Sequence, residues 1–243
     1  LTYALNGNAD FMGDDIHYAS NHDFVGIEFS IHGMLDGRVR VGMPGKFNAD
    51  NALAALAVCT LALSGGSGVL DDHTKQAILG SLVKVRVDGR MEIAHVSKKC
   101  SVIVDYAHNA VSMESLLTTL RDYHPKRLVC VFGCGGNRAR DRRYSMGEIG
   151  GKMADLCIIT ADNPRFEKNE DIIKDIEVGL AKTDGTYLVI PDRREAIFYA
   201  IRNAEEGDMI AIIGKGHEDY QEIEGVKHHF LDREVVEEAV NNV

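Results

Sequence analysis

The chain has 243 residues, of which 45% are hydrophobic and 26% charged, a balance typical of an ordinary globular protein. Its 37 acidic and 27 basic residues give a formal net charge of −10, which argues against a general binder of nucleic acid or of anionic membranes. No run approaches the ~20 apolar residues that a membrane span needs. Five cysteines, an odd number without a C-x-x-C pair, indicate reduced thiols and a cytoplasmic protein.

The first part of the sequence has the pattern of an antiparallel sheet. It opens on Leu1, inside an apparent strand and without a signal peptide, so we expect a piece of a longer protein. Up to about residue 45 there are short alternating runs broken by Gly and Asp, for example residues 24–31 and 38–43.

Two helices are predicted next. Residues 47–64 are rich in Ala and Leu and apolar on most faces, which indicates a buried helix that ends at the glycine pair 65–66. A second helix is expected at about residues 72–79. We place a domain boundary after it, with one domain at 1–88 and the next at 89–243.

From about residue 90 strands and helices alternate, which predicts a Rossmann-like α/β fold with a doubly wound, mostly parallel sheet. The strands are nearly all apolar, as in a sheet covered on both faces, and are expected at residues 101–105, 127–132, 156–160, 186–190 and 209–213. Helices are expected at about 110–123, 145–154, 169–182, 193–205 and 232–241. Ligands of such sheets bind beyond the carboxyl ends of the strands.

The first of these strands ends in the segment VDYAHN (104–109). A carboxylate such as Asp105 can accept hydrogen bonds from ribose hydroxyls, and His108 can face a phosphate or a base. A cap at the start of the next helix explains the same residues, so the motif alone leaves both interpretations open.

The second strand is followed by GCGGNR (133–138) and by Arg140, Arg142 and Arg143. Glycines let the backbone approach a ligand closely, and arginines offer forked donors to a carboxylate or a phosphate. The spacing differs from the G-x-G-x-x-G of dinucleotide-binding folds. A turn followed by a solvated basic helix start is the alternative.

The third strand ends in ADNPR (161–165). Pro164 fixes its own φ angle and favours an extended Asn163, so the segment is stiff. It can therefore hold Asn163 and Arg165 as preorganised ligands of a carboxylate, although an ordinary turn has the same composition.

The fifth strand ends in GKGHEDY (214–220). The segment invites comparison with a P-loop, but the pattern G-x-x-x-x-G-K-[ST] occurs nowhere in the chain. Glu218 can pair with an ammonium group, and a glycine-rich turn with exposed charges is the plainer interpretation.

Four such motifs at strand ends of one sheet, with several arginines and one acid, indicate a zwitterionic or multiply charged ligand. No metal-ligand spacing and no Ser–His or Cys–His pair stands out. We therefore predict neither a metal site nor a catalytic nucleophile within this chain.

In their order these motifs resemble the Mur ligase family, and in particular its members that add meso-diaminopimelate. Two further segments, GKFNADNALAA (45–55) and GRME (89–92), belong to the match, which extends over the whole chain. The resemblance implies that residues 1–88 are the last part of a central ATP-binding domain without its P-loop. Residues 89–243 would then form a Rossmann-like domain that binds the incoming amino acid.

The resemblance also implies a reaction. In the family, ATP phosphorylates a carboxylate of a UDP-N-acetylmuramoyl dipeptide, and the amine of the amino acid attacks the acyl phosphate. The P-loop, the Mg²⁺ ligands and a modified lysine of the family have no counterpart in this sequence, so we expect no ligase activity from the chain alone. A cytoplasmic monomer that acts on small molecules, without nucleic-acid or membrane partners, is expected.

Roles at the nucleotide follow from the match. Asn51 corresponds to an asparagine near adenine, and Arg90 to an arginine that reaches the phosphates of ATP. Asp105 corresponds to an acid on the ribose, with His108 in the same motif.

Roles at the amino acid follow in the same way. Arg138, Asn163 and Arg165 correspond to groups that hold its distal carboxylate, and Gly214 and Glu218 to groups that hold its distal ammonium end. Lysine has no second carboxylate, so the two arginines would face its side-chain end unpaired. We therefore expect diaminopimelate rather than lysine.

The match departs from the family pattern at three positions. Asn137 stands where an Asp is common, Tyr144 where a Pro is expected, and Leu231 in place of the first of two acids. The alternatives are an L-lysine-adding relative, a stand-alone Rossmann-like module that binds an amino acid or a nucleotide, and a folylpolyglutamate synthetase. The segments DNPR and GKGHE argue against the last.

Overall fold

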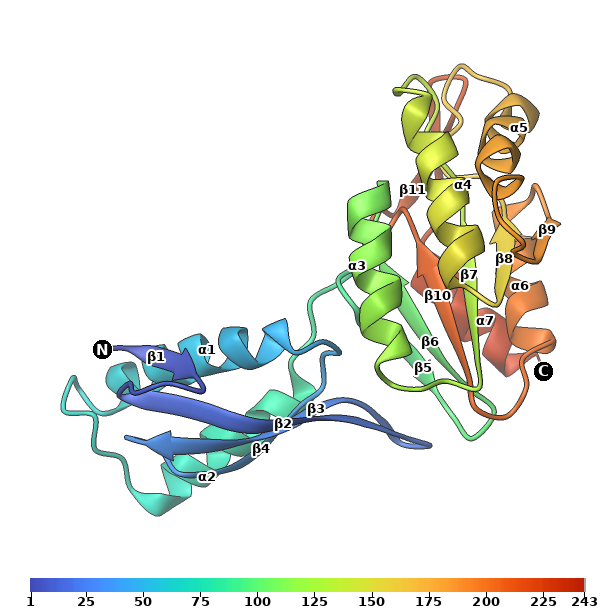
Figure 1. The fold of residues 1–243 in the computed structure, drawn as a ribbon. Coiled ribbons are helices and arrows are strands. Elements are labelled where there is room, and N and C mark those ends of the chain that lie inside the picture. Colours follow the sequence, from blue (N-terminus) through green and yellow to red (C-terminus); the bar gives the residue numbers. More distant parts are fainter. Residues whose placement is uncertain (243) are drawn as a thin grey trace. The chain divides into compact units, whose positions relative to one another are not determined.

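The computed structural model describes residues 1–242 and divides into two compact units, Leu1–Arg86 and the part of the chain from Val87 onward (Figure 1). The division falls two residues before the domain boundary expected from the sequence.

The first unit is a four-stranded sheet with two helices. The sheet order is β1-β2-β3-β4, in which β1 is parallel to β2 and the other pairs are antiparallel. The strands are β1 (Tyr3–Leu5), β2 (Phe11–Asn21), β3 (Phe24–Gly33) and β4 (Gly37–Val41). The helices are α1 (Phe47–Leu63) and α2 (Asp72–Ser81), followed by the 3₁₀ turn η1 (Leu82–Lys84).

Both helices of this unit lie where the sequence predicts them. Helix α1 packs against the sheet through Leu53 and Leu56, which are buried with Phe29 of β3. It ends at Gly65 and Gly66, whose φ angles of 61° and 89° lie in the left-handed region that glycine adopts without strain.

The second unit is a six-stranded sheet in the order β5-β6-β10-β7-β8-β9. All neighbours are parallel except the edge strand β5, which is antiparallel to β6. The strands are β5 (Glu92–Val96), β6 (Cys100–Asp105), β7 (Arg127–Phe132), β8 (Leu156–Ile159), β9 (Tyr187–Val189) and β10 (Asp208–Ile213). The prediction of a doubly wound, mostly parallel sheet is confirmed.

Helices cover both faces of this sheet (Figure 1). On one face lie α3 (Ala110–Arg121), α4 (Asp141–Met153) and α5 (Asn169–Leu180), and on the other α6 (Arg193–Arg202) and α7 (Asp232–Asn241). From β6 through β7 and β8 to β9 the chain moves in one direction across the sheet, and right-handed crossovers then place the connecting helices on one face. The return from β9 to β10 reverses this direction, so α6 lies on the opposite face.

Three local features differ from the sequence expectation. Helix α4 begins at Asp141, four residues before the predicted start, so the basic residues at its beginning lie on the helix. Strand β5 was not expected, nor was the hairpin of β11 (Tyr220–Ile223) and β12 (Val226–His229). The hairpin strands read YQEI and VKHH, and neither shows the apolar alternation of a half-buried strand.

The sheet order decides where the sequence motifs lie. The four strands that carry them, β6, β10, β7 and β8, are consecutive neighbours in the sheet. Because these strands are parallel, their carboxyl ends meet at one edge.

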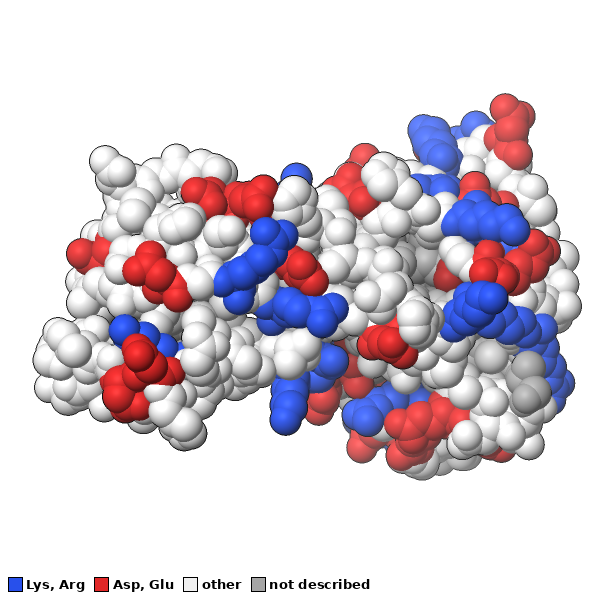
Figure 2. All heavy atoms as spheres, turned by 90° about the horizontal axis from the view of Figure 1, so that it is seen from below, with Lys and Arg blue, Asp and Glu red and all other residues white. Residues whose placement is uncertain are grey.

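The surface carries charges of both signs. On the face drawn in Figure 2, Lys and Arg side chains lie among Asp and Glu side chains over each unit. Within residues 1–242, no helix has the length and apolar character to cross a bilayer.

Candidate functional site

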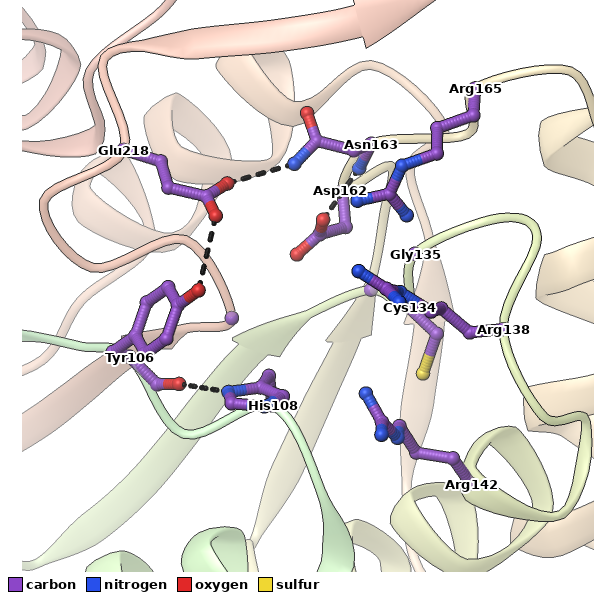
Figure 3. Close-up of a pocket in the computed structure, with 12 residues that line it drawn as sticks. Tyr106, His108, Cys134, Gly135, Arg138, Arg142, Asp162, Asn163, Arg165 and Glu218 are labelled. Carbon is purple, nitrogen blue, oxygen red and sulfur yellow. Dashed lines mark hydrogen bonds between the residues drawn. The ribbon is translucent and has the colours of Figure 1, made fainter.

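A cavity of about 250 Å³ lies in the second unit, at the carboxyl ends of these four strands (Figure 3). Its lining comes from the loops that follow β6, β7, β8 and β10 and from the first turn of α4. The residues are Tyr106, His108, Gly133, Cys134, Gly135, Arg138, Arg142, Asp162, Asn163, Arg165, Gly214 and Glu218. Of the nine residues predicted for the site, six therefore line one cavity: His108, Arg138, Asn163, Arg165, Gly214 and Glu218.

Glu218 is fixed on one side of the cavity by three neighbours. Its Oε1 accepts a hydrogen bond from the Tyr106 hydroxyl at 3.2 Å, and its Oε2 accepts one from Asn163 Nδ2 at 2.8 Å (Figure 3). The ammonium of Lys215, which is fully buried, lies 3.7 Å from Oε2. These contacts within the protein hold the carboxylate in place, and such preorganisation favours recognition of a cation.

Asp162 forms a second acidic group of the cavity. Its Oδ1 accepts a hydrogen bond from Asn163 N at 2.6 Å. Burial raises the pKa of Asp162, and the positive charges of Arg193 and Lys215 oppose that rise. A Cβ added at Gly214, where φ is 114°, would lie 2.6 Å from Asp162 Oδ2, so only glycine leaves room for the carboxylate there.

Arg165 lies on the other side of the cavity and is held by the unexpected hairpin. Its Nε is 3.3 Å from Glu222 Oε2, and its Nη1 donates to the Gly136 carbonyl oxygen at 2.8 Å. Its backbone bonds to β11 and to the hairpin turn: Arg165 N donates to Glu222 O at 3.0 Å, and Glu224 N donates to Arg165 O at 2.7 Å. A φ of 53° at Arg165 is uncommon for a residue with a Cβ, and these contacts hold it.

The loop after β7 meets the loop after β8 closely. A Cβ at Gly136 would lie 1.9 Å from the Pro164 carbonyl oxygen, which explains the need for glycine. The next residue, Asn137, has a φ of 53°, a conformation that Asn adopts more readily than most residues. Arg138 follows at the mouth of the cavity, exposed to solvent.

Three of the four residues predicted to bind nucleotide, Arg90, Asp105 and His108, belong to the second unit. Both oxygens of the buried Asp105 accept backbone hydrogen bonds, from Met91 N at 2.8 Å and from Ala107 N at 2.7 Å. Burial raises the pKa of Asp105, and these two bonds oppose the rise. Arg90 lies with its guanidinium carbon 5.2 Å from the centre of the Tyr106 ring, and His108 Nδ1 lies 2.8 Å from the Tyr106 carbonyl oxygen.

Asn51 belongs to the first unit. It lies on the exposed side of α1, and its amide donates to Asn48 Oδ1 at 3.0 Å. Arg90 and Asp105 belong to the second unit.

Sequence reasoning assigned no role to Tyr106, Asp162 or Lys215. All three lie inside the quoted motifs, so a signal was present. Only the fold shows that Tyr106 and Lys215 contact Glu218, and that the charge of Lys215 acts on Asp162. Glu222 carried no signal, because its strand was not predicted. Across the described residues 1–242 no cluster of three or more His, Cys, Asp and Glu side chains has the arrangement of a metal site.

Comparison with known proteins places this fold and cavity in a class. The glutamate ligase domain of the Mur ligases matches residues 89–216, which is more than half of the chain, so the chain belongs to the Mur ligase family. The resemblance seen in the sequence is confirmed.

The curated relatives point to one member of that family. The chain is 41% identical, over its whole length and 48% of the relative, to the UDP-N-acetylmuramoyl-L-alanyl-D-glutamate--2,6-diaminopimelate ligase of Clostridioides difficile. It is 42% identical to the ligase of the same name from Aquifex aeolicus, over 97% of this chain and 44% of the relative. The chain thus spans about half the length of the curated relatives it matches.

Comparison with solved structures gives the same result as comparison with the curated relatives. A structure of a UDP-N-acetylmuramoyl-L-alanyl-D-glutamate--2,6-diaminopimelate ligase matches the whole chain and 47% of its own length, with a TM-score of 0.75 and 35% identity. A folylpolyglutamate synthase from Thermotoga maritima matches 83% of the chain and 43% of its own length, with a TM-score of 0.57 and 23% identity. At that identity the second match shows the fold alone.

Proposed function

We propose that this chain is the carboxy-terminal part of an ATP-dependent ligase that joins meso-diaminopimelate to UDP-N-acetylmuramoyl-L-alanyl-D-glutamate in peptidoglycan synthesis. One observation carries the proposal: three arginines and a fixed carboxylate face one another across a single cavity at the ends of four adjacent strands. The names of the relatives give the same substrate.

The charges of the cavity suit the far end of diaminopimelate, where a carboxylate and an ammonium group share one carbon. In the proposed complex Arg138, Asn163 and Arg165 hold the distal carboxylate. Glu218 holds the distal ammonium beside Gly214, on the opposite side of the cavity (Figure 3). Arginine suits the first task because its fork matches the two oxygens of a carboxylate.

Lysine is the alternative substrate, and the same charges disfavour it. Its side chain ends in an ammonium without a carboxylate, so Arg138 and Arg165 would face a positive group instead of a negative one. A preference for diaminopimelate then follows from an unfavourable interaction with the competitor as much as from an attraction to the substrate.

We propose that residues 89–243 form the amino-acid-binding domain, and that residues 1–88 are the last part of the ATP-binding domain. ATP would contact Asn51, Arg90, Asp105 and His108, and the P-loop and the Mg²⁺ ligands would be supplied by the rest of the enzyme. ATP would activate the D-glutamate carboxylate as an acyl phosphate, which the amine of diaminopimelate attacks. The role of the second unit is to place that amine, a contribution of orientation rather than of acid–base chemistry. We also propose a cytoplasmic monomer.

The test is product formation by the full-length enzyme from ATP, the UDP-linked dipeptide and either meso-diaminopimelate or L-lysine. We expect ATP-dependent product with diaminopimelate at least about tenfold faster than with lysine, which corresponds to about 1.4 kcal/mol of discrimination. Calorimetric titration of this chain with both amino acids provides the control for binding without catalysis.

Two results would oppose the proposal in different ways. Faster product formation with lysine would make the protein a lysine-adding ligase. Binding of an amino acid without any ATP-dependent product from the full-length protein would favour a stand-alone binding module.

A further inference from the structure

Four arginines follow the glycine segment after β7, and the fold divides them into two pairs. Arg140 forms a two-point ion pair with Asp175, with N–O distances of 2.9 and 3.1 Å. Arg143, only 1% exposed, lies 2.9 Å from the same carboxylate and 2.8 Å from Glu167 Oε1. These two arginines link α4 to α5 and to the loop that precedes α5. Acidic side chains of the protein balance their charges.

Arg138 and Arg142 form the second pair, and both line the cavity. Within residues 1–242, neither guanidinium has a carboxylate partner or a hydrogen bond to another residue, in contrast to Arg140, Arg143 and Arg165. Arg142 lies on the first turn of α4 and is half-buried. Figure 3 draws the guanidinium groups of Arg165, Arg138 and Arg142 in succession along one side of the cavity, with Glu218 across from Arg165 and His108 nearest to Arg142.

The charges that face the cavity exceed what one zwitterionic group can balance. Arg165 is already paired with Glu222, and Glu218 has Lys215 at 3.7 Å. Asp162, the other acid of the cavity, has Arg193 and Lys215 as its positive neighbours. Arg138 and Arg142 have no such partner among the described residues, and the single distal carboxylate of an amino acid can balance only one of them. A half-buried cation is poorly solvated, and an anion beside it is favoured.

From this we infer that Arg142 binds a second anionic oxygen group of the ligand, at the end of the cavity remote from Arg165. This inference rests on the proposed function and adds a residue to that site. If the distal end of the amino acid lies between Glu218 and Arg165, its reacting end points toward Arg142. The group available there is the carboxylate beside the reacting amine, and the phosphoryl oxygens of the acyl phosphate are the second source of the same chemistry.

The chain offers a matched control. Arg142→Gln and Arg140→Gln remove the same charge one helical turn or less apart, but Arg140 is exposed and points at Asp175. Arg142→Lys keeps the charge and replaces the forked guanidinium with an ammonium group. Calorimetry on the full-length enzyme measures the Kd of meso-diaminopimelate and of inorganic phosphate for the wild type and these variants, and thermal unfolding verifies that each is folded.

We expect Arg142→Gln to raise the Kd of meso-diaminopimelate roughly tenfold, the effect of losing one charge-assisted hydrogen bond. Arg142→Lys should recover most of the loss, and Arg140→Gln should change the Kd less than about twofold. Loss of phosphate binding with an unchanged Kd for diaminopimelate would also support the subsite and would assign it to the phosphoryl group.

Equal behaviour of Arg142→Gln and Arg140→Gln toward both ligands would overturn the inference. The proposed function is tested separately. A wild-type enzyme that binds phosphate in an Arg142-dependent way but does not bind diaminopimelate would support the anion subsite and contradict the proposed substrate.

Discussion

The side chains of Arg193 and Asp232 form a two-point ion pair, with both N–O distances at 2.7 Å and neither side chain exposed to solvent. The same guanidinium donates to the carbonyl oxygens of Ala161, at 3.2 Å, and Ile213, at 3.1 Å. These carbonyls immediately precede the DNPR and GKGHE segments. Arg193 and Asp232 therefore link the starts of α6 and α7 to the segment that follows β8 and to the end of β10.

Removing one member of this pair should cost much more than removing both. Arg193→Met leaves the Asp232 carboxylate buried without a partner, and we expect the free energy of unfolding to fall by about 3–5 kcal/mol. Adding Asp232→Leu removes that charge, so the double variant should recover most of the loss. Urea unfolding followed by far-ultraviolet circular dichroism measures both.

The double variant also separates stability from positioning. It lacks the bonds to the two carbonyls, so its affinity for meso-diaminopimelate should remain lowered although the stability returns. A double variant as unstable as the single one would show that the buried charge is not the cause.

Arg165 should matter for the amino acid and little for the nucleotide. In the full-length enzyme, Arg165→Ala is expected to raise the KM for meso-diaminopimelate by roughly ten- to a hundredfold, because a forked contact to a carboxylate is lost. The KM for ATP should change less than about threefold. Arg194→Ala, which removes an exposed arginine on α6, is the control, and equal losses for both substrates would remove Arg165 from its proposed role.

Glu218 should act through its charge rather than its shape. Glu218→Gln keeps a side chain that can bond to Tyr106 and Asn163, yet it no longer attracts an ammonium group. We expect the Kd of meso-diaminopimelate to rise roughly tenfold. Glu237→Gln, an exposed acid on α7, is the matched control, and an unchanged Kd for Glu218→Gln would refute the assignment.

Asp162 gives a prediction about pH. Burial raises the pKa of this carboxyl above its ordinary value of 3.8, so the folded protein holds the proton more tightly than the unfolded chain does. The contribution of Asp162 to stability is therefore largest at low pH, and it declines as the pH rises from 3.8 through the raised pKa.

Asp162→Asn does not ionise and lacks this dependence. The free energy of unfolding of the wild type, minus that of the variant, should decrease as the pH rises through this acidic range. Urea titrations at a series of pH values test the sign, and a difference that stays flat or grows with pH contradicts the pKa direction.

Much of the fold follows from the sequence because it depends on local periodicity. Apolar runs such as residues 209–213 indicate buried strands whatever their neighbours are, and the glycine pair after residue 64 ends a helix by its backbone freedom alone. Polar motifs at the strand ends predict a ligand site there, since parallel strands share one carboxyl edge. The chain's own residues also carried the family resemblance.

Tertiary structure decided what depends on contacts between distant segments. The placement of β10 between β6 and β7 makes the four motif-bearing strands neighbours, and no local pattern encodes that order. The same holds for the arginines of the loop after β7: identical in kind, they differ because Asp175 and Glu167 reach Arg140 and Arg143 but not Arg142. Ion pairing and burial depend on which side chains are in contact in the folded protein, and local sequence patterns do not predict those contacts.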